Sequence, residues 1–397
     1  MPRLTDDGLT DWTPTRAAAL ERLAEFLPHA GVDYARLRNI DRGPDDRSNV
    51  SALSPWIRRR ILTEEEVIAA VLRRHGFARA EKFIQEVCWR TYWKGWLELR
   101  PGVLADYHAA AARLSAEWAD SAALAAARGG QTGIACFDAW AAELVRTGWL
   151  HNHARMWFAS IWIFTLRLPW ELGAAFMAQH LLDADPASNT LSWRWVAGLQ
   201  TPGKHYLARA ENIRLNTLGR FDPAGQLDEQ ALPVPMVAPN PPPGAIPPAQ
   251  VPATDRVALL LTEEDLSPET LPVGATVVAL AALTTPSADS PAGRFAAGAV
   301  ADGLDRAGAQ FGLAGQLLAP EAVAAWALDA GVSEVVTACA PLGPSAPVLD
   351  EIERALALVS IRLVRVRRAW DTQCWPLATR GFFAFRQHIP KLVAGLV

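Results

Sequence analysis

Aromatic side chains are concentrated in the first half of this chain, and their type suits a large planar ligand or electron transfer. The sequence has 16 Trp against only 4 Tyr, and 13 of the Trp stand at or before Trp195. Large indoles most often pack in a core or an interface, and that explanation holds for any single one of them. So many in one segment also suit an aromatic ligand or electron hopping between rings.

Three residues that combine charge with an aromatic ring share one helical face near residue 90. Glu86, Trp89 and Arg90 are spaced i, i+3 and i+4 in the segment EKFIQEVCWRTYW, residues 81–93. Residues at this spacing lie on the same side of a helix. A carboxyl group, an indole and a guanidinium are therefore presented together.

Motifs for metals, disulfides and nucleotides are missing from the sequence. The cysteines lie far apart and form no CxxC: Cys88, Cys136, Cys339 and Cys374. They are typical of reduced thiols in a cytosolic protein and predict neither a disulfide framework nor a metal site. The sequence contains no GxGxxG and no GxxxxGK[ST], so no motif supports a nucleotide site in its second half.

The segment TGWLHNHARMWFASIWIFTLRLPWELGAAFMAQHLLDADPASNTLSWRWVAGLQTPGKHYL, residues 147–207, is the most informative stretch. It contains GW-x-HN-x-x-R-M and, further on, D-x-D-x-x-x-N-x-x-x-W-x-W. It resembles the flavin-binding helical domain of the DNA photolyase/cryptochrome family. Residues 51–67 and 81–93 resemble the phosphate-binding loop and the W-R-E-F-Y helix of the same family. The resemblance covers roughly residues 34–222 and implies an all-helical domain that binds FAD.

The resemblance implies a set of cofactor contacts. Arg155 and Asp183 match the family's ion pair beside the isoalloxazine, and Asp185 matches the acid near the polar edge of the ring. Asn189 matches the residue facing flavin N5, where a neutral amide can hydrogen-bond a protonated nitrogen without adding negative charge. Ser51 and Ser54 can donate to the pyrophosphate. The other residues in this set are Tyr34, Arg38, Leu53, Glu86, Arg90, Trp149 and Asn152. Each of these also has a bland explanation, such as a structural ion pair or a helix cap.

Three indoles match the family's electron-transfer chain. From the flavin outwards these are Trp193, Trp170 and Trp118, and Trp118 needs a one-residue shift to align. The chemistry requires oxidisable rings in near contact, leading from a buried flavin to solvent. Packing explains any one of them equally well.

The resemblance also implies a substrate pocket. Trp89 and Trp195 match the aromatic wedge for a pyrimidine dimer flipped out of DNA. Glu86 matches the carboxyl group that hydrogen-bonds the bases, and Met156 matches the Met of cyclobutane-dimer enzymes. His153 stands where repair enzymes usually carry Arg. Further departures from the family pattern are Val50, Ala52 and Thr91.

Two functions stay open on these residues. One is an enzyme in which blue light drives electron transfer from reduced flavin into a dimer in damaged DNA. Cations for the phosphates would come from Arg58, Arg59 and Arg60, or from Arg73 and Arg74, although solvated helix faces explain them as well. The alternative is a cryptochrome-type photoreceptor that signals to a partner without repair. A flavin-dependent redox protein unrelated to light is a third option. We expect repair.

A proline-rich stretch divides the chain. Residues 231–252 contain nine prolines in 22 positions and predict an extended tether within a linker at 223–254. Residues 1–222 read as helices. In residues 255–397, short apolar runs alternate with helical segments, which predicts a smaller α/β Rossmann-like domain with a parallel sheet. This domain resembles the α/β antenna domain that photolyases usually place first, so we interpret the chain as a circular permutation. No residues for an antenna chromophore are identifiable.

Length and charge limit the remaining classes. The chain has 397 residues, 50% of them apolar and 20% charged, which excludes a largely disordered protein. A net charge of −4 argues against a non-specific nucleic-acid coat. The N-terminus MPRLTDDGLTDW lacks the apolar run of a signal peptide, and no apolar stretch reaches membrane-spanning length. We therefore expect a cytoplasmic protein with no membrane partner.

Overall fold

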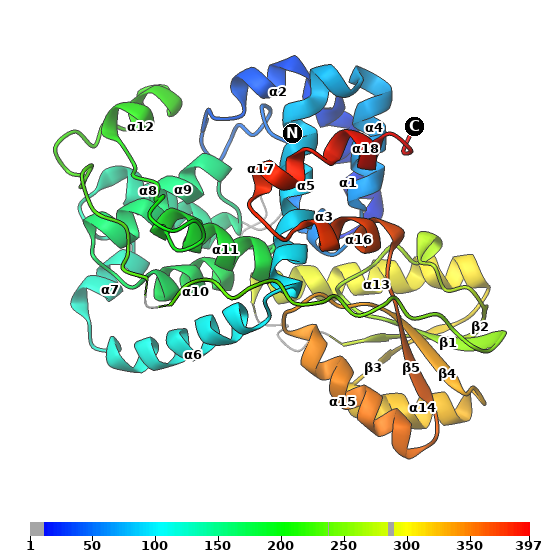
Figure 1. Ribbon diagram of the computed structural model, residues 1–397. Helices are drawn as coiled ribbons and strands as arrows, with labels where there is room; N and C mark the ends of the chain where they lie inside the picture. Colours follow the sequence, from blue (N-terminus) through cyan, green and yellow to red (C-terminus); the bar gives the residue numbers. More distant parts are fainter. Residues whose placement is uncertain (1–11, 237, 285–289) are drawn as a thin grey trace.

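The computed structural model describes residues 12–236, 238–284 and 290–397. A helical part comes first in the chain and a five-stranded parallel sheet with its helices follows (Figure 1). The helical part contains α1 Arg16–Phe26, η1 Leu27–His29, α2 Val32–Leu37, α3 Ser54–Arg58, α4 Glu64–His75, α5 Phe77–Glu98, α6 Gly102–Glu117, α7 Ala122–Arg128, α8 Ala135–Thr147, α9 Asn152–Ser160, the π-helical turn η2 Ile161–Thr165, α10 Trp170–His180, α11 Pro186–Ala197 and α12 Ala210–Asn216.

The part after the linker alternates strands and helices. It contains β1 Arg256–Leu261, η3 Pro268–Thr270, β2 Thr276–Leu283, α13 Pro291–Phe311, β3 Gly315–Leu318, η4 Pro320–Ala322, α14 Val323–Asp329, β4 Glu334–Ala338, α15 Ser345–Leu358, β5 Arg362–Val366, α16 Ala369–Cys374, η5 Trp375–Leu377, α17 Phe382–Arg386 and α18 Ile389–Val393. The expected mainly helical chain with a parallel sheet is confirmed at this level.

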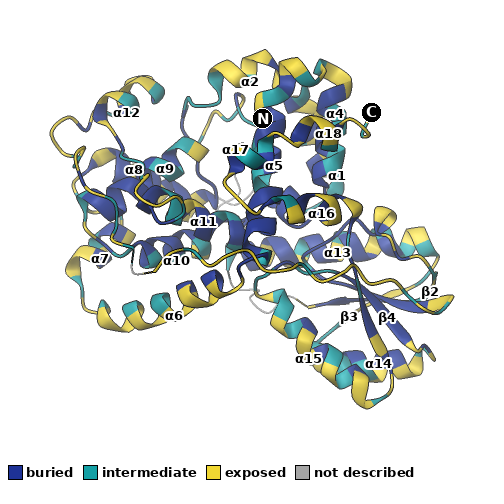
Figure 2. Cartoon of the chain, viewed as in Figure 1, coloured by how far each residue is buried: buried dark blue, intermediate teal, exposed yellow. Residues whose placement is uncertain are grey.

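Local sequence signals explain where the helices beside the site begin. Thr63 caps α4, because its hydroxyl accepts from the N–H of Glu66 while the Glu66 carboxylate accepts from the N–H of Thr63. This reciprocal capping box satisfies two N–H groups that a helix start leaves unpaired. The helix α5 follows directly and runs for 22 residues. Thirteen of its side chains are buried, so α5 forms the centre of the helical part (Figure 2).

The sheet has the strand order β3-β2-β1-β4-β5, with every pair parallel. Its two faces are packed against different helices. Val257, Leu259 and Leu261 of β1 join the core that includes α13, whereas Ala258 and Leu260 join a second core with α14 and α15. This alternation is the period of two that a strand imposes on its side chains.

The proline-rich linker runs without helix or strand over its described residues and is hydrogen-bonded along its path. Near its start, the N–H of Val234 donates to Ala197 O at 3.0 Å. In its middle, Arg100 Nε donates to Pro241 O at 2.9 Å. Near its end, Arg362 Nη2 donates to Val251 O at 3.1 Å. The linker is therefore a strap held by both parts of the chain.

The end of the chain packs differently from the expected α/β domain at 255–397. After β5 the chain leaves the sheet, and α16, α17 and α18 lie against α4 and α5 of the helical part. Trp370 Nε1 donates to Thr91 Oγ1 at 2.9 Å, which ties α16 to the middle of α5. The last helices therefore complete the helical core and leave the sheet to residues 256–366.

Among the described residues, no helix is long and apolar enough to cross a membrane. The same residues contain no group of three or more His, Cys, Asp or Glu side chains arranged to hold a metal ion. All four cysteines are free, and only Cys339 is partly exposed.

Candidate functional site

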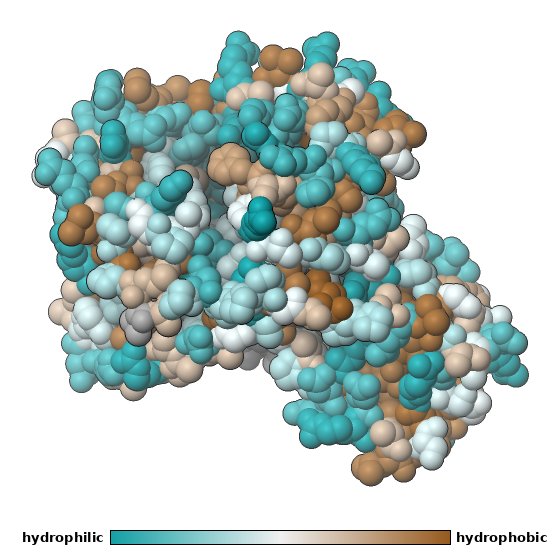
Figure 3. All heavy atoms as spheres, in the orientation of Figure 1, coloured by the Kyte–Doolittle hydropathy of each residue, from teal (hydrophilic) through white to brown (hydrophobic). Residues whose placement is uncertain are grey.

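One cavity of about 530 Å³ opens into the helical part. Pockets of roughly 300–1,000 Å³ are typical of small-molecule and cofactor sites. Its walls come from α2, the loop before α3, α5, α9, the end of α10 and α11. These elements are separated by up to about 160 positions in the chain, from Tyr34 to Val196. Figure 3 shows a hollow in the face of the molecule near α17 of Figure 1.

The cavity brings together every residue that was assigned to the cofactor or to the flipped bases. The lining includes Tyr34, Arg38, Ser51, Leu53, Ser54, Glu86, Trp89, Arg90, Trp149, Asn152, His153, Arg155, Met156, Asp183, Asp185, Asn189 and Trp195. Trp193 also lines it, whereas Trp118 and Trp170 do not. The roles of these residues stay predictions, but their common location is a property of the fold.

A charged network lies along one wall. Arg155 Nη1 lies 3.3 Å from Asp183 Oδ2, and Arg155 Nε donates to Leu150 O at 2.9 Å. Arg90 reaches both acids, with an ion pair to Asp185 and a longer contact of 3.9 Å to Asp183. Burial opposes ionisation of Asp183, but Arg155 and then Arg90 hold its pKa below the ordinary value. Both acids are therefore carboxylates held by guanidinium groups.

The turn between the two acids has an unusual backbone. Ala184 has φ 37°, a positive value that L-residues adopt rarely and at a cost. Asp185 then caps α11, because its Oδ1 accepts from the N–H of Ser188 at 2.8 Å. Residue 184 therefore lets two successive acids, Asp183 and Asp185, line the same cavity.

Asn189 is held in one orientation. Its Nδ2 donates to the carbonyl oxygen of Ala174 in α10 at 2.8 Å, and its side chain is buried. One of the two amide N–H groups is thereby engaged, so Asn189 keeps Oδ1 as an acceptor and the second N–H as a donor.

Trp193 has a buried hydrogen-bond donor beside the cavity. No described residue accepts from its Nε1, and the ring lines the cavity. Buried indole N–H groups normally find an acceptor. The ring packs on α10 at Gly173, where a Cβ would lie 2.4 Å from Trp193 Cη2. Its ring neighbour at 6.2 Å is Trp162, which the sequence analysis did not single out.

The outer indoles are arranged differently from the expected chain. Trp170 stacks on Tyr107 of α6, with ring centroids 5.6 Å apart. Trp118 ends α6 eleven residues after Tyr107, which is roughly 16 Å along a helix axis at 1.5 Å per residue. Tyr107 is therefore the ring that stacks on Trp170. No motif in the sequence marks Tyr107.

Glu86 and His153 are both shifted towards neutrality. Glu86 forms an ion pair with Arg38, yet burial raises the pKa of Glu86 against the pull of that guanidinium. Burial lowers the pKa of His153 to about 4, and the neighbouring His151 and Arg38 add to the effect. At neutral pH His153 is therefore an uncharged imidazole on the wall of the cavity.

Both residues of the expected aromatic wedge are stacked on one face. Trp89 stacks on Phe382 of α17, with centroids 3.6 Å apart and planes 12° apart. Trp195 stacks on Tyr206 at 5.8 Å. A planar ligand therefore has only the opposite face or the edge of each indole available. Phe382 lies more than 170 positions beyond the motif region and carried no signal in the sequence.

The arginines at 58–60 do not form the expected surface for phosphates. Arg58, Arg59 and Arg60 are 5%, 3% and 2% exposed. Arg58 binds Glu264 with both terminal nitrogens, and Arg60 Nη2 donates to both oxygens of Asp371 at 2.7 and 2.6 Å. This prediction was wrong, because the acids that neutralise these cations come from a distant part of the chain. Arg73 and Arg74, at the end of α4, are exposed.

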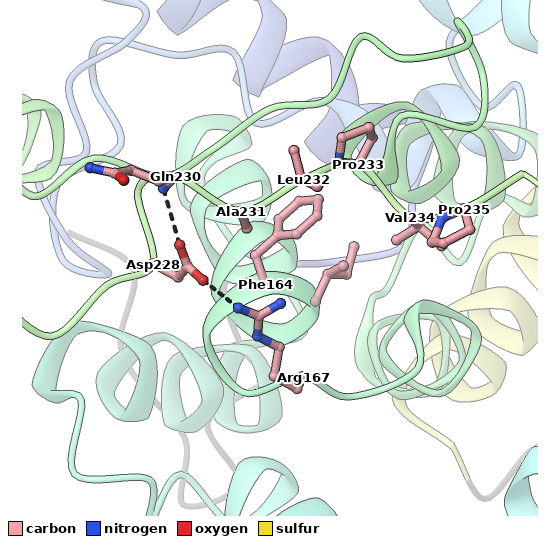
Figure 4. A pocket seen from close by; sticks show the side chains of 10 residues that line it. Phe164, Arg167, Asp228, Gln230, Ala231, Leu232, Pro233, Val234 and Pro235 are labelled. Atoms are coloured by element: carbon pink, nitrogen blue, oxygen red, sulfur yellow. Dashed lines mark hydrogen bonds and ion pairs between the residues drawn. The ribbon is translucent and has the colours of Figure 1, made fainter.

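A second hollow of about 520 Å³ lies where the linker passes Phe164 and Arg167 (Figure 4). Its polar groups are already paired. Arg167 forms an ion pair with Asp228, which also accepts from the N–H of Gln230 at 3.0 Å. None of the predicted site residues lines it.

Comparison with known proteins agrees with the contents of the cavity. A family model described as the FAD binding domain of DNA photolyase matches residues 83–238. This segment is similar to the FAD-binding domain of DNA photolyases. The match covers 156 of the 397 residues, including α5, α9, α10 and α11. FAD is thus the cofactor that the comparison supports.

Named relatives give the same family. The chain is 25% identical over 230 residues to a deoxyribodipyrimidine photo-lyase of Vibrio cholerae, which covers 56% of this chain and 48% of that protein. It is 28% identical over 232 residues to cryptochrome-2 of Arabidopsis thaliana, covering 56% and 37%. The chain spans about half the length of the curated photo-lyases it matches. These relatives support a similarity of the chain to photolyases and cryptochromes.

Among solved structures, a bacterial class III photolyase from Agrobacterium tumefaciens is similar, with a TM-score of 0.45 and 25% identity. It covers 54% of this chain and 46% of that one. A TM-score of this size adds no weight to the family assignment.

Proposed function

We propose that this protein is a FAD-dependent, blue-light-driven enzyme that repairs pyrimidine dimers in DNA, as photolyases do. One observation carries the proposal. Residues that were assigned to flavin and substrate contact from separate motifs line a single cavity, and most of them lie in residues 83–238, the segment similar to a photolyase FAD-binding domain. When bound there, FAD would supply light absorption and the electron for cleavage of the dimer.

The cavity residues fit FAD. Asn189 lines the cavity, and because one of its amide N–H groups is engaged with Ala174 it keeps Oδ1 as an acceptor and the second N–H as a donor. Such an acceptor suits a protonated ring nitrogen. Arg155 and Asp183 would hold the isoalloxazine side, while Ser51 and Ser54 would hold the pyrophosphate.

Electrons would enter through indoles. Trp193 lines the cavity, and it packs on α10 one helical turn from Trp170. Tyr107 stacks on Trp170, so we infer that Tyr107, in place of Trp118, is the next ring outwards. A phenol is oxidised with loss of its proton, and burial raises the pKa of Tyr107 to about 12.

The substrate side would use Glu86, Trp89 and Trp195. Glu86 lines the cavity beside Trp89, and burial raises the pKa of its carboxyl group, which would face the bases. Unstacking a damaged pair costs only a few kcal/mol, which contact with aromatic faces can offset. Each indole keeps one face for this purpose, since the other is taken by Phe382 or Tyr206.

A cryptochrome-type photoreceptor is the second candidate, and two observations favour it. His153 is neutral where a fixed cation would contact DNA, and Arg58, Arg59 and Arg60 are buried in ion pairs. Such a protein would still undergo photoreduction through Trp193, but it would act on a signalling partner and leave dimers unchanged.

Two measurements separate these functions. The FAD-loaded protein is illuminated with reductant, and the flavin spectrum is followed for the wild type and for Trp193→Phe, which should suppress photoreduction. The reduced protein is then illuminated with dimer-containing DNA, and restored bases are counted. Photoreduction with no restored bases would establish the photoreceptor in place of repair. A protein that never takes up FAD would end both proposals.

We also propose that the α/β part is the antenna-type domain of the family in permuted order. The support is its parallel sheet placed after the helical part, with the chain returning from β5 to α5 through α16. A chain in which residues 255–397 precede residues 12–222 should fold and bind FAD if this is correct. Failure of that chain to fold would contradict it.

A further inference from the structure

The C-terminal helix α17 is fixed to the helix that forms the cavity wall. Phe382 stacks on Trp89 at 3.6 Å. Tyr92 Oη donates to Arg380 O at 2.8 Å, and Arg100 Nη2 donates to Thr379 O at 2.8 Å. The segment before and within α17 is therefore anchored along α5 and reaches a residue that lines the cavity.

The outer face of α17 carries an aromatic ring in solvent. Phe382 and Phe385 are 5% and 1% exposed, whereas Phe383 between them is 73% exposed. The guanidinium carbon of Arg386 lies 5.5 Å from the ring centroid of Phe383. Phe383 and Arg386 are spaced i, i+3 and so share a face. An exposed Phe next to a cation is the pair of groups that stacks on a nucleobase and contacts a phosphate.

The charged side chains around α17 and after it are all basic. Residues 372–397 contain no Asp or Glu, but they contain Arg380, Arg386 and Lys391. Arg380 and Lys391 are exposed, Arg386 is half-buried, and none of the three forms an ion pair with another described residue. Unpaired cations around an exposed ring suit a polyanion better than an apolar protein partner.

We propose that α17 is a nucleic-acid contact at the rim of the cavity, with Phe383 stacking on a base beside the lesion and Arg380, Arg386 and Lys391 binding phosphates. This inference rests on the proposed repair function, because Phe382 connects α17 to Trp89, the residue assigned to the flipped bases. A dimer that leaves the duplex exposes the neighbouring bases, and Phe383 offers them a replacement for the lost stacking. The hollow near α17 in Figure 3 agrees with this position.

The test measures binding in the dark to a labelled duplex with one cyclobutane thymine dimer, and to the same duplex undamaged, by fluorescence anisotropy. FAD-loaded Phe383→Ala should bind the damaged duplex about tenfold more weakly, since one base–aromatic stack is lost. Binding to the undamaged duplex should change little. Phe383→Tyr should restore the affinity. Leu358→Ala is the matched control, because Leu358 is an exposed apolar residue of α15 at 89% exposure.

Arg386→Gln tests the phosphate contact separately. It should weaken binding to both duplexes alike, and it should reduce the slope of log affinity against log salt by about 0.9, the value for one phosphate contact. Unchanged flavin photoreduction in each variant shows that the fold is intact.

The outcomes distinguish the proposal that α17 contacts DNA from the proposal that the protein repairs dimers. If the wild type prefers damaged DNA and Phe383→Ala keeps the same preference and affinity, the rim proposal is overturned and repair stands. If the wild type binds both duplexes alike, the repair proposal fails and the rim proposal fails with it.

Discussion

The cavity and the interface between the two parts of the chain are built from the same types of charged side chain, but they differ in the open space beside those charges. In the cavity, Arg90 and Arg155 hold Asp183 and Asp185, and a volume of about 530 Å³ stays open beside them. We call the second region the domain interface, which comprises Arg58, Arg59 and Arg60 with Glu263, Glu264, Asp265 and Asp371.

At the domain interface each of the three arginines meets an acid at close range, and their side chains are almost completely buried. Arg60 Nη2 donates to both oxygens of Asp371 at 2.7 and 2.6 Å, and Arg59 donates to Leu182 O at 2.9 Å. In the cavity, by contrast, Arg155 keeps 24% of its side chain exposed, and open volume lies beside the charges. Open space next to partly exposed charges distinguishes the cavity from the buried ion cluster, and charge alone does not.

Breaking the domain interface should have the largest effect on stability. Arg60→Ala removes the guanidinium that pairs with Asp371 and also contacts Asp265 and Glu64. A buried carboxylate that loses its partner typically lowers the free energy of unfolding by about 3–5 kcal/mol. Chemical denaturation measures the loss. Arg73→Ala, at an exposed position of α4, is the control and should change stability by less than about 0.5 kcal/mol. Similar small losses in both variants would mean that the interface is as hydrated as the surface.

Breaking the cavity network should release flavin and cost less stability. Arg155→Ala leaves Asp183 with only the longer contact to Arg90 at 3.9 Å. Because Arg155 is partly exposed, we expect the binding free energy of FAD to fall by about 2 kcal/mol, which is roughly a 30-fold loss of affinity. Asp183→Ala should act in the same direction. Titration of the apoprotein with FAD measures both. Arg146→Ala, exposed on α8, should bind FAD as the wild type does. Equal affinity in Arg155→Ala would make the pair purely structural.

The difference between the two regions also explains which predictions the sequence supported. Most cavity residues belong to motifs on α5, α9 and α11 by which the chain resembles the photolyase/cryptochrome family, so that resemblance was enough to predict them. The apolar runs RVALLL and TVVALAAL, residues 256–261 and 276–283, predict strands β1 and β2 at their observed bounds, because continuous apolar runs mark buried strands. Strand β3 was missed because its four residues GQLL are largely exposed and too short for a pattern.

The failures share a physical cause, since each depends on contacts between distant parts of the chain. Arg58 was read as a surface cation because its partner, Glu264, lies 206 positions away. Phe382 covers Trp89 from 293 positions away, and Tyr107 stacks on Trp170 because the helices α6 and α10 meet there. No local pattern encodes such pairs, and only packing reveals them.

The contact between α5 and the loop after β4 should respond to pH in the opposite direction from a salt bridge. Burial raises the pKa of Glu98 to about 7, and Glu98 accepts from the N–H of Leu342 at 2.6 Å. The folded protein therefore favours the protonated carboxyl group. Its stabilising contribution is complete below the unfolded value, near 4.5, and is lost as the pH rises through about 7.

Glu98→Gln keeps an acceptor for Leu342 and removes the titration. We expect it to raise the free energy of unfolding by about 2 kcal/mol at pH 8 and by less than about 1 kcal/mol at pH 5, where only a small part of the contribution is lost. Denaturation curves at the two pH values measure this. Glu117→Gln, at the exposed end of α6, is the control and should show no such difference. A gain at pH 5 as large as that at pH 8 would show that the effect is not protonation.

The smallest expected effect concerns the backbone between the two cavity acids. Ala184 has φ 37°, a conformation that costs an L-residue about 1–2 kcal/mol and costs glycine little. Glycine also adds about 0.5–1 kcal/mol of chain entropy to the unfolded state, so Ala184→Gly should stabilise the protein by only about 0.5 kcal/mol. The control is Ala178→Gly in α10, which should destabilise by about 1 kcal/mol because helix interiors disfavour glycine. Opposite signs in urea denaturation would show that the cavity holds a strained turn in order to present Asp183 and Asp185 together, whereas equal losses would show a turn without strain.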